Sequence, residues 1–575
     1  MVVRKRSRQK LELVAIVLVA LAAGLVQHPP GDNQTAHLAL VKALADGTPI
    51  IDRYQDETDD DSYVDGHFYT AKAPGLAFFS EPWYLLLRVT DLDVANPGAG
   101  LGTRDAFLLM PRMALWQMGV FGTTLPLLLL LLLVRWAGER VAPGYGGLTA
   151  VLGGLGTLLF PFGSLFFAHV LAATLAFAAF CVLLRERDRV PRPLSTLAAG
   201  ALAGLAIVVE FPTGLIALVL AGLVFAGQRP AARGLAYAGG VFLGVIPLLA
   251  FNTWAFGSPL KLSYTNAVIK AGQSGHDVVG ANSSGFFGVG VPSGRVALEL
   301  LFSNKGLFLV CPLLLAAAPG LVLLGRQKRK AEALVCGGVG FAFLVYNAGY
   351  FLPFGGWTPG PRLLIPAIPF LLVPVAAALA ARPYATTAIG ACSAAVMVLA
   401  NAIAPIVSEE KSIHFWLDQA RTANFTETLL SRWGWGHGWG AIAPVLLLAL
   451  GALVIAVVAD LRAPPSAREL ELAAAVVGAW LILLATMPEL LWSDRQVGTA
   501  TGAVAVVALC TGLVLALVLV SRRGAVGLIA LLPFAVVAWP EFALHTKWAL
   551  VAAVVGIALA LVALRLPSPQ TDHAT

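Results

Sequence analysis

Asp32 is a carboxylate in a position that suits acid–base chemistry at a membrane surface. It lies in "HPPGDNQTAH", almost directly after the first apolar run, which ends at Gln27. A carboxylate held there can act as a general base towards a substrate that is anchored in the lipid. The same residue also fits a helix N-cap, because Pro and Gly precede it and a helical pattern follows it. The two roles do not exclude each other.

Lys72 lies in "DGHFYTAKAPG", between aromatic residues and a Pro-Gly pair, and soon after the acidic stretch 56–61. A cation in this position suits a phosphate group held at the interface. The alternatives are a lysine that snorkels to the interface and one that forms a salt bridge with the acidic stretch. That stretch partly resembles a calcium-binding loop, but it lacks the glycine and the closing glutamate at the required spacing. A solvated loop is the favoured interpretation.

Further candidates lie at the ends of later apolar runs. His169 follows "PFGSLFFA" and Glu210 precedes "FPTG". Ionisable groups at membrane depth are functional candidates, although either one alone could be satisfied at the interface. Arg362 follows a rigid Pro-Gly-Pro and can bind phosphate through two parallel hydrogen bonds. Lys261 and Lys305 add cations on the same predicted side, with anchoring at the interface as their alternative role.

The composition shows what surrounds these residues. The chain has 575 residues, of which 58% are hydrophobic and only 12% are charged. A soluble globular protein has about 25% charged residues, so this chain needs the bilayer as solvent for much of its surface. Its net charge of +7 comes from short basic clusters between apolar runs. These clusters indicate membrane topology and give no sign of a nucleic-acid partner.

The apolar runs predict an all-α polytopic membrane protein of about sixteen transmembrane helices, since a spanning helix needs about 20 apolar residues. The runs begin near Leu11, Leu109, Gly147, Leu165, Ser195, Thr213, Leu235, Gly306, Ala333, Leu363, Thr387, Ala441, Leu470, Thr499, Ala525 and Trp548. We interpret the first as a retained signal anchor. The cysteines predict neither disulfides nor a metal site, because all lie inside apolar runs without paired spacing: Cys181, Cys311, Cys336, Cys392 and Cys510.

Loop charges orient the predicted bundle. Basic clusters such as "RKRSRQK", "RERDRVPR" and "GRQKRK" fall on one side if every run spans, and such loops stay in the cytoplasm. The N-terminus is then cytoplasmic, while the loops 28–105 and 252–305 are extracytoplasmic. The long first loop includes "LALVKALADG", whose helical spacing suits a short interfacial helix. All the candidate residues above share this outer side.

The sequence predicts no nucleotide cofactor. Walker motifs, a convincing Rossmann fingerprint and a soluble domain are all missing from it. The acidic residues leave the binding of a divalent metal ion as an open alternative, although the sequence lacks His and Asp residues at the spacing of a metal-ligand set.

The order of these short motifs resembles the polytopic GT-C glycosyltransferases, in particular the family 39-like group of protein O-mannosyltransferases and lipid A aminoarabinose transferases. "PPGDNQTAHLALVKALADGTPIID" is similar to the acidic residue, helix and turn of their first outer loop, and "DGHFYTAKAPGLAFFSEPWY" to their Y-x-x-K-x-P segment. "GPRLLIPAIPF" is similar to a segment frequent in bacterial members. The resemblance covers about residues 10–380, so we expect a GT-C-like catalytic module over 1–380 and transmembrane helices of unknown role over 381–575.

The resemblance implies residue roles. Asp32 corresponds to the catalytic aspartate and Lys72 to the lysine that contacts phosphate, and a role for Arg362 is implied as well. His169 and Glu210 depart from the family, which often has a second acid and a lysine at these places. The full set of substrate-binding candidates is Lys72, Arg362, His169, Glu210, Tyr69, His67, Lys261 and Lys305.

The implied activity is transfer of a sugar from a polyprenyl-phosphate donor, with inversion, on the extracytoplasmic side of a bacterial plasma membrane. The acceptor would be a glycan, a lipid or a protein. The alternative is a polytopic transporter or lipid flippase. That class places its ionisable groups near the bilayer midplane and often contains internal repeats. The candidates here lie at the outer ends of runs, which favours the enzyme.

Overall fold

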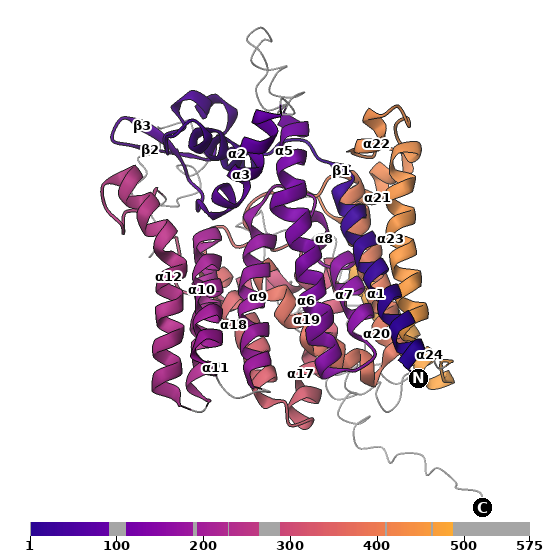
Figure 1. The fold of residues 1–575 in the computed structure, drawn as a ribbon. Coiled ribbons are helices and arrows are strands. Elements are labelled where there is room, and N and C mark those ends of the chain that lie inside the picture. The colour runs from indigo at the N-terminus through magenta and orange to yellow at the C-terminus, as the bar shows by residue number, and fades with distance from the viewer. Residues whose placement is uncertain are drawn as a thin grey trace, which may run out of the picture.

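The computed structural model of the chain is an α-helical bundle that carries a cap of short helices and strands at one end (Figure 1). It describes residues 2–90, 111–187, 192–227, 229–263, 288–408, 411–461 and 464–486. Apolar spans form helices because a bilayer offers no hydrogen-bond partners, and only a helix satisfies its backbone groups within one segment. Seven described helices are long and apolar enough to cross a membrane, so the fold is that of an all-α, multi-pass membrane protein.

The elements of the described residues follow the chain in three groups. The first helix and the cap contain α1 (Val2–Gly24), β1 (Val26–Gln27), α2 (Asp32–Ala45), η1 (Asp52–Glu57), β2 (Asp61–Val64), β3 (His67–Thr70) and α3 (Gly75–Val89). The bundle continues with α5 (Pro111–Gly119), η2 (Val120–Thr124), α6 (Leu125–Val141), α7 (Gly146–Leu155), α8 (Leu159–Phe162), α9 (Ala168–Arg187), α10 (Pro193–Val209), η3 (Phe211–Thr213), α11 (Gly214–Phe225) and α12 (Pro230–Phe256). The last group is α15 (Gly294–Phe302), α16 (Leu307–Val310), η4 (Pro312–Ala316), α17 (Ala317–Arg326), α18 (Lys330–Gly349), η5 (Arg362–Ala367), α19 (Ile368–Ala381), α20 (Pro383–Ile403), α21 (Ile413–Arg421), β4 (Glu427–Thr428), α22 (Leu429–Arg432), α23 (Trp439–Asp460) and α24 (Ala467–Thr486).

The predicted spans lie where the structure has helices, but several of these helices are shorter than a full span or are bent. Each run from the one near Leu11 to the one near Leu470 overlies a described helix or helix pair, while those near Thr499, Ala525 and Trp548 lie outside the described residues. Counting the bent pair formed by Gly294–Val310 and Pro312–Arg326 adds an eighth span to the seven, so sixteen full spans are not shown. Hydropathy counts apolar residues but does not register a break such as the 102° bend at Pro312.

The two ends of the bundle differ in charge. The N-terminus and the turns between α11 and α12 and between α17 and α18 lie at the lower end in Figure 1, opposite the cap. Ion pairs join the helices there, including Arg233 to Glu186 at 2.9 Å and Arg187 to Glu332 at 3.7 Å. The described basic loops therefore share one end of the bundle, as the alternation of loop charges predicts.

A buried ionic cluster holds α1 in place near that same end. Arg8 pairs with Glu12 on its own helix and with Glu139 on α6. Arg135 Nη2 lies 2.5 Å from the second carboxylate oxygen of Glu12, whose side chain is fully buried. Every charge in this group therefore has a partner, which offsets the cost of removing it from water.

Close helix packing joins α10 and α12. Gly200 and Gly204 on α10, and Gly240 and Gly244 on α12, are spaced four residues apart, which is the pattern of small residues that lets two helices approach closely. A β-carbon on any of the four would lie 2.1–2.3 Å from a carbonyl oxygen of the opposite helix. The contact requires glycine at these positions because only glycine leaves room for the facing backbone.

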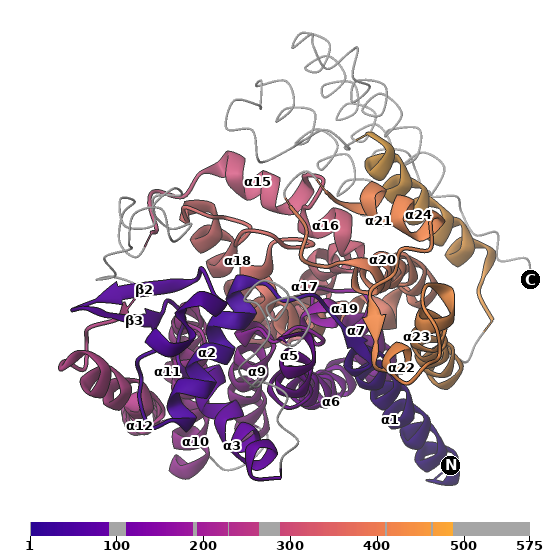
Figure 2. The same ribbon diagram turned by 90° about the horizontal axis from the view of Figure 1, so that it is seen from above.

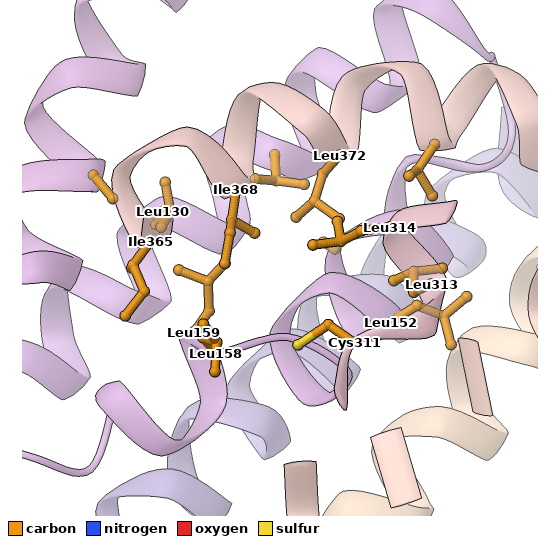
Figure 3. Close-up of a cluster of buried hydrophobic side chains, with 14 of the residues drawn as sticks. Leu130, Leu152, Leu158, Leu159, Cys311, Leu313, Leu314, Ile365, Ile368 and Leu372 are labelled. Carbon is orange, nitrogen blue, oxygen red and sulfur yellow. The ribbon is translucent and has the colours of Figure 1, made fainter. Parts of the chain in front are cut away.

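One hydrophobic core extends across the predicted boundary at 380. It includes Ala15 of α1 and Trp480 of α24. Figure 3 shows one part of it, with Leu130 of α6, Leu152 of α7 and Leu372 of α19 among its side chains. β1 also pairs antiparallel with β4, with Val26 opposite Thr428. The helices after residue 381 are thus packed into the same body as α1, and the proposed division of roles does not correspond to a division of the core.

Candidate active site

Asp32 is the first residue of α2, in the cap that lies over the bundle in Figures 1 and 2. The N-cap is Gly31, whose backbone is extended, and no side chain caps the helix. The interpretation of Asp32 as the N-cap is therefore wrong by one residue. Glycine is an accepted N-cap, so Asp32 moves into the first turn and its exposed carboxylate is not used for capping. Thr58 Oγ1 donates a hydrogen bond to the backbone oxygen of Asp32 at 2.9 Å and ties the acidic stretch to this turn.

A β-hairpin brings the acidic stretch to Lys72. β2 and β3 pair antiparallel with Asp61 opposite Thr70, and the turn uses Asp65 and Gly66, both with positive φ. The register continues beyond the strands, so that Lys72 Nζ lies 2.5 Å from Asp60 Oδ2. The structure therefore has the salt bridge with the acidic stretch that the sequence left as an alternative. The Asp-Gly pair is a hairpin signal that would have predicted this pairing.

The start of α3 fixes where Lys72 lies relative to the bundle. Gly75 packs against the end of α10, and a β-carbon there would lie 2.7 Å from the backbone of Val208 and Val209. Lys72 is three residues before this contact, and Glu210 directly follows Val209. The contact therefore brings Lys72 and Glu210 to the same part of the protein.

Glu210 lies at the break between α10 and η3 and faces His169 at the start of α9. His169 Nδ1 is 2.9 Å from Glu210 Oε1, although the contact lacks the alignment of a hydrogen bond. His169 is 4% exposed, and no described group hydrogen-bonds to its Nε2. Burial would raise the pKa of Glu210, but its interaction with His169 and the charge of Lys72 outweigh burial and hold this pKa below its usual value.

Arg362, the first residue of η5, has unused hydrogen-bonding capacity. Its guanidinium lies over the ring of Phe167, with 5.2 Å between the central carbon and the ring centroid. Its buried Nε has no hydrogen-bond partner among the described residues, and Nη1 makes only a long 3.5 Å contact with Trp357 O. Gly355, with φ +87°, makes room for the side chain, since a β-carbon there would lie 2.7 Å from Nε. The charges of Asp60 and Glu210 both act on Arg362.

These side chains form one group, here called the outer cluster: Asp32, His37, Asp60, Lys72, His169, Glu210 and Arg362. Partial desolvation of the Asp32 carboxylate, then the charges of Asp59 and Asp60, raise its pKa against the opposing effect of Lys72. Burial lowers the pKa of His37 to about 3, so this imidazole is neutral. No sequence motif pointed to His37, which is buried in α2. The interpretation of the acidic stretch as a solvated loop missed Asp60, which pairs with Lys72.

Four predicted site residues have other partners. His67 Nδ1 lies 2.7 Å from Asp52 Oδ2 on the exposed side of the hairpin. Tyr69 donates to Ala255 O at 3.2 Å and so fastens the hairpin to α12. Lys261 pairs with Asp65 at the hairpin turn, 3.1 Å away. Lys305 is buried and donates to the backbone oxygens of residues 407 and 408. A shared side of the membrane did not imply a shared site for these four.

The described residues contain no group of three His, Cys, Asp or Glu side chains that could hold a metal ion. Within the acidic stretch, Asp60 is paired with Lys72.

No protein-family model and no curated protein sequence matches the chain. ArnT from Cupriavidus metallidurans in the apo state is 13% identical, with a TM-score of 0.38, over 95% of this chain and 76% of its own. The same protein bound to undecaprenyl phosphate is 15% identical, with a TM-score of 0.37, over 96% and 76%. The oligosaccharyltransferase of Archaeoglobus fulgidus is 13% identical, with a TM-score of 0.39, over 85% and 61%.

At such identities and scores these similarities assign neither residue roles nor an activity to this chain.

Proposed function

We propose that this chain is a membrane glycosyltransferase that moves a sugar from a polyprenyl-phosphate donor to an acceptor hydroxyl on the outer face of the bilayer. The observation that carries the proposal is the outer cluster. It combines the carboxylate of Asp32, which caps no helix and has a raised pKa, with two cations, Lys72 and Arg362. The cluster lies at the end of the bundle opposite the basic loops. A general base beside an anion site is what such a transfer requires.

Lys72 and Arg362 bind the phosphate of the donor in this proposal. The carboxylate of Asp60 supports it, because this anion already pairs with Lys72 and acts on Arg362. Asp60 thus stands in for an anionic ligand at Lys72. The buried Nε of Arg362, which lacks a partner among the described residues, leaves a donor for an incoming phosphate oxygen. Phosphate binding then displaces Asp60 from Lys72.

Asp32 removes the proton of the acceptor hydroxyl. The hydroxyl oxygen forms a bond to the anomeric carbon while the bond from that carbon to the phosphate oxygen breaks. The bonding electrons leave with the phosphate, where Lys72 and Arg362 stabilise the added charge. A single displacement inverts the anomeric carbon. The raised pKa of Asp32 makes it a stronger base than an ordinary aspartate, and its exposed side chain is accessible to the acceptor.

The sides of the membrane follow from loop charge. The described basic loops gather at the end where Arg233 pairs with Glu186, and basic loops remain in the cytoplasm. The outer cluster, at the other end, is then extracytoplasmic, in a bacterial plasma membrane. The acceptor is a glycan, a lipid or a protein.

A transporter or lipid flippase is the second candidate, and the buried charges around Glu12 are the feature that it would use. Ionisable groups inside a membrane protein often line a transport path. Here Arg8 and Arg135 already neutralise Glu12, and the group joins α1 to α6. A structural link accounts for these residues, so the enzyme remains the favoured function.

The test is release of polyprenyl phosphate from a polyprenyl-phosphate hexose by the chain reconstituted in lipid nanodiscs with a hydroxyl acceptor. Asp32→Asn should lower kcat by about 10²–10⁴-fold, the usual contribution of a general base, with little change in donor affinity. Lys72→Ala should weaken donor binding. Lys411→Ala, which removes an exposed lysine that contacts Phe415 outside the cluster, is the matched control and should bind donor normally. Lipid scrambling without bond cleavage would replace the proposal with the flippase.

A further inference from the structure

Glu210 and His169 form a polar pair that lies beside aromatic side chains. The imidazole of His169 lies among aromatic rings, with centroid distances of 5.5 Å to Phe162 and 5.8 Å to Phe167. Its Nε2 is buried and has no hydrogen-bond partner in the described part of the chain. A buried polar atom left without a partner costs free energy, so such an atom in a candidate site points to a group that a ligand supplies.

The pair has the chemistry that recognises hydroxyl groups. The carboxylate of Glu210 accepts hydrogen bonds, and Nε2 of His169 can bond to a hydroxyl in either tautomer, because a hydroxyl both donates and accepts. Adjacent hydroxyls of a sugar ring match this combination, and the rings of Phe162 and Phe167 suit its apolar C–H faces. A carboxylate on the ligand does not match, because it would face Glu210 with like charge.

The pair also lies where the sugar of the donor must be. Arg362 stacks on Phe167, and His169 lies beside the same ring. In a polyprenyl-phosphate sugar, the phosphate is bonded directly to the anomeric carbon. A phosphate at Arg362 therefore brings the sugar next to His169 and Glu210.

We propose that Glu210 and His169 bind the hydroxyl groups of the donor's sugar and select a neutral sugar over a hexuronic acid. This inference rests on the proposed function. It makes Glu210 a specificity-determining residue that acts on the sugar, separately from the cations that bind the phosphate.

Three lipids separate the two sites in a binding assay with the full chain in nanodiscs: bare polyprenyl phosphate, a polyprenyl-phosphate hexose and a polyprenyl-phosphate hexuronic acid. The wild type should bind the hexose lipid at least about tenfold more tightly than either other lipid, the factor expected for hydrogen bonds to a charged group. Glu210→Gln should reduce the preference for hexose over hexuronic acid to about threefold or less, while the affinity for bare polyprenyl phosphate stays the same or rises.

Glu299→Gln is the matched control. Glu299 is 23% exposed, against 20% for Glu210, and pairs with Arg295 on α15 outside the outer cluster. Its substitution should leave all three affinities unchanged. His169→Gln provides a second variant if Glu210→Gln does not fold. It should lower the affinity for the hexose lipid and leave the affinity for the other two lipids unchanged.

The outcomes distinguish the inference from the proposal on which it rests. A preference for hexose that survives both substitutions overturns the sugar site, even if bare polyprenyl phosphate binds through Lys72 and Arg362. An equal affinity of the wild type for the hexose and hexuronic lipids overturns it as well. Failure of the wild type to bind any of the three lipids instead overturns the proposed function and, with it, the sugar site.

Discussion

Replacing Gly75 by alanine tests whether the contact between α3 and α10 sets the geometry of the outer cluster. The added β-carbon would lie 2.7 Å from backbone atoms of Val208 and Val209, whereas ordinary contact begins at 3.4 Å. The two backbones must therefore separate by about 0.7 Å, because the atoms that the new β-carbon would meet belong to the backbone and not to a flexible side chain. Overpacking of this kind costs about 1–3 kcal/mol of stability.

The same displacement should lower activity, because it moves Lys72 away from Glu210. A misplacement of about 1 Å in a catalytic site can reduce the rate by about 10²-fold. For Gly75→Ala we expect kcat to fall by about tenfold to a hundredfold, together with a lower midpoint of thermal unfolding. Both are measured on the purified chain in one detergent, with release of polyprenyl phosphate as the activity.

The control is Gly222→Ala on α11. Nothing lies within 4 Å of a β-carbon at Gly222, so this variant should keep full activity and gain up to about 1 kcal/mol of helix stability. If Gly75→Ala retains both the unfolding midpoint and the turnover of the wild type, the contact with α10 does not set the geometry of the site.

Three further predictions follow from other contacts. Asp32 must be ionised to accept a proton, so activity is lost as the pH falls through its pKa. Asp59→Asn removes a charge that raises this pKa and should move the acid limb of the kcat/KM profile to lower pH. A limb that does not move would count against Asp32 as the base. Gly244→Ala places a β-carbon 2.3 Å from a carbonyl oxygen of α10 and should lower the unfolding midpoint, whereas Gly239→Ala on the same helix, with nothing within 4 Å, should not. Glu12→Gln removes the buried carboxylate that pairs with both Arg8 and Arg135 and should destabilise the chain by about 3–5 kcal/mol. An unchanged unfolding midpoint would show that the cluster is not a structural link.

The sequence predicted where helices lie better than how they are built. Apolar runs located the described helices because burial in lipid demands long apolar segments. They did not reveal that the run near Gly306 bends by 102° at Pro312, or that α7 is only ten residues long. Breaks of this kind are set by how a helix packs against its neighbours, which periodicity does not record.

For the site, loop charge predicted the correct end of the bundle for Asp32, Lys72 and Arg362 but not which residues would meet. Position along the bundle is a single coordinate, and Lys261 lies at the same end while it pairs with Asp65 of the hairpin turn. The pairing of Lys72 with Asp60 depends on the register of β2 and β3, which the Asp-Gly turn encodes. The N-cap prediction for Asp32 failed because two adjacent residues can each cap a helix.

The pairing of β1 with β4 has a consequence for biosynthesis. About four hundred residues separate Val26 from its partner Thr428. At a translation rate of about 5–20 residues per second, the ribosome needs roughly 20–80 s to make the second strand after the first. During that interval the earliest helix has reached the membrane, but neither β4 nor the helix that follows it exists. Final closure of the fold around α1 is therefore among the last events of its assembly.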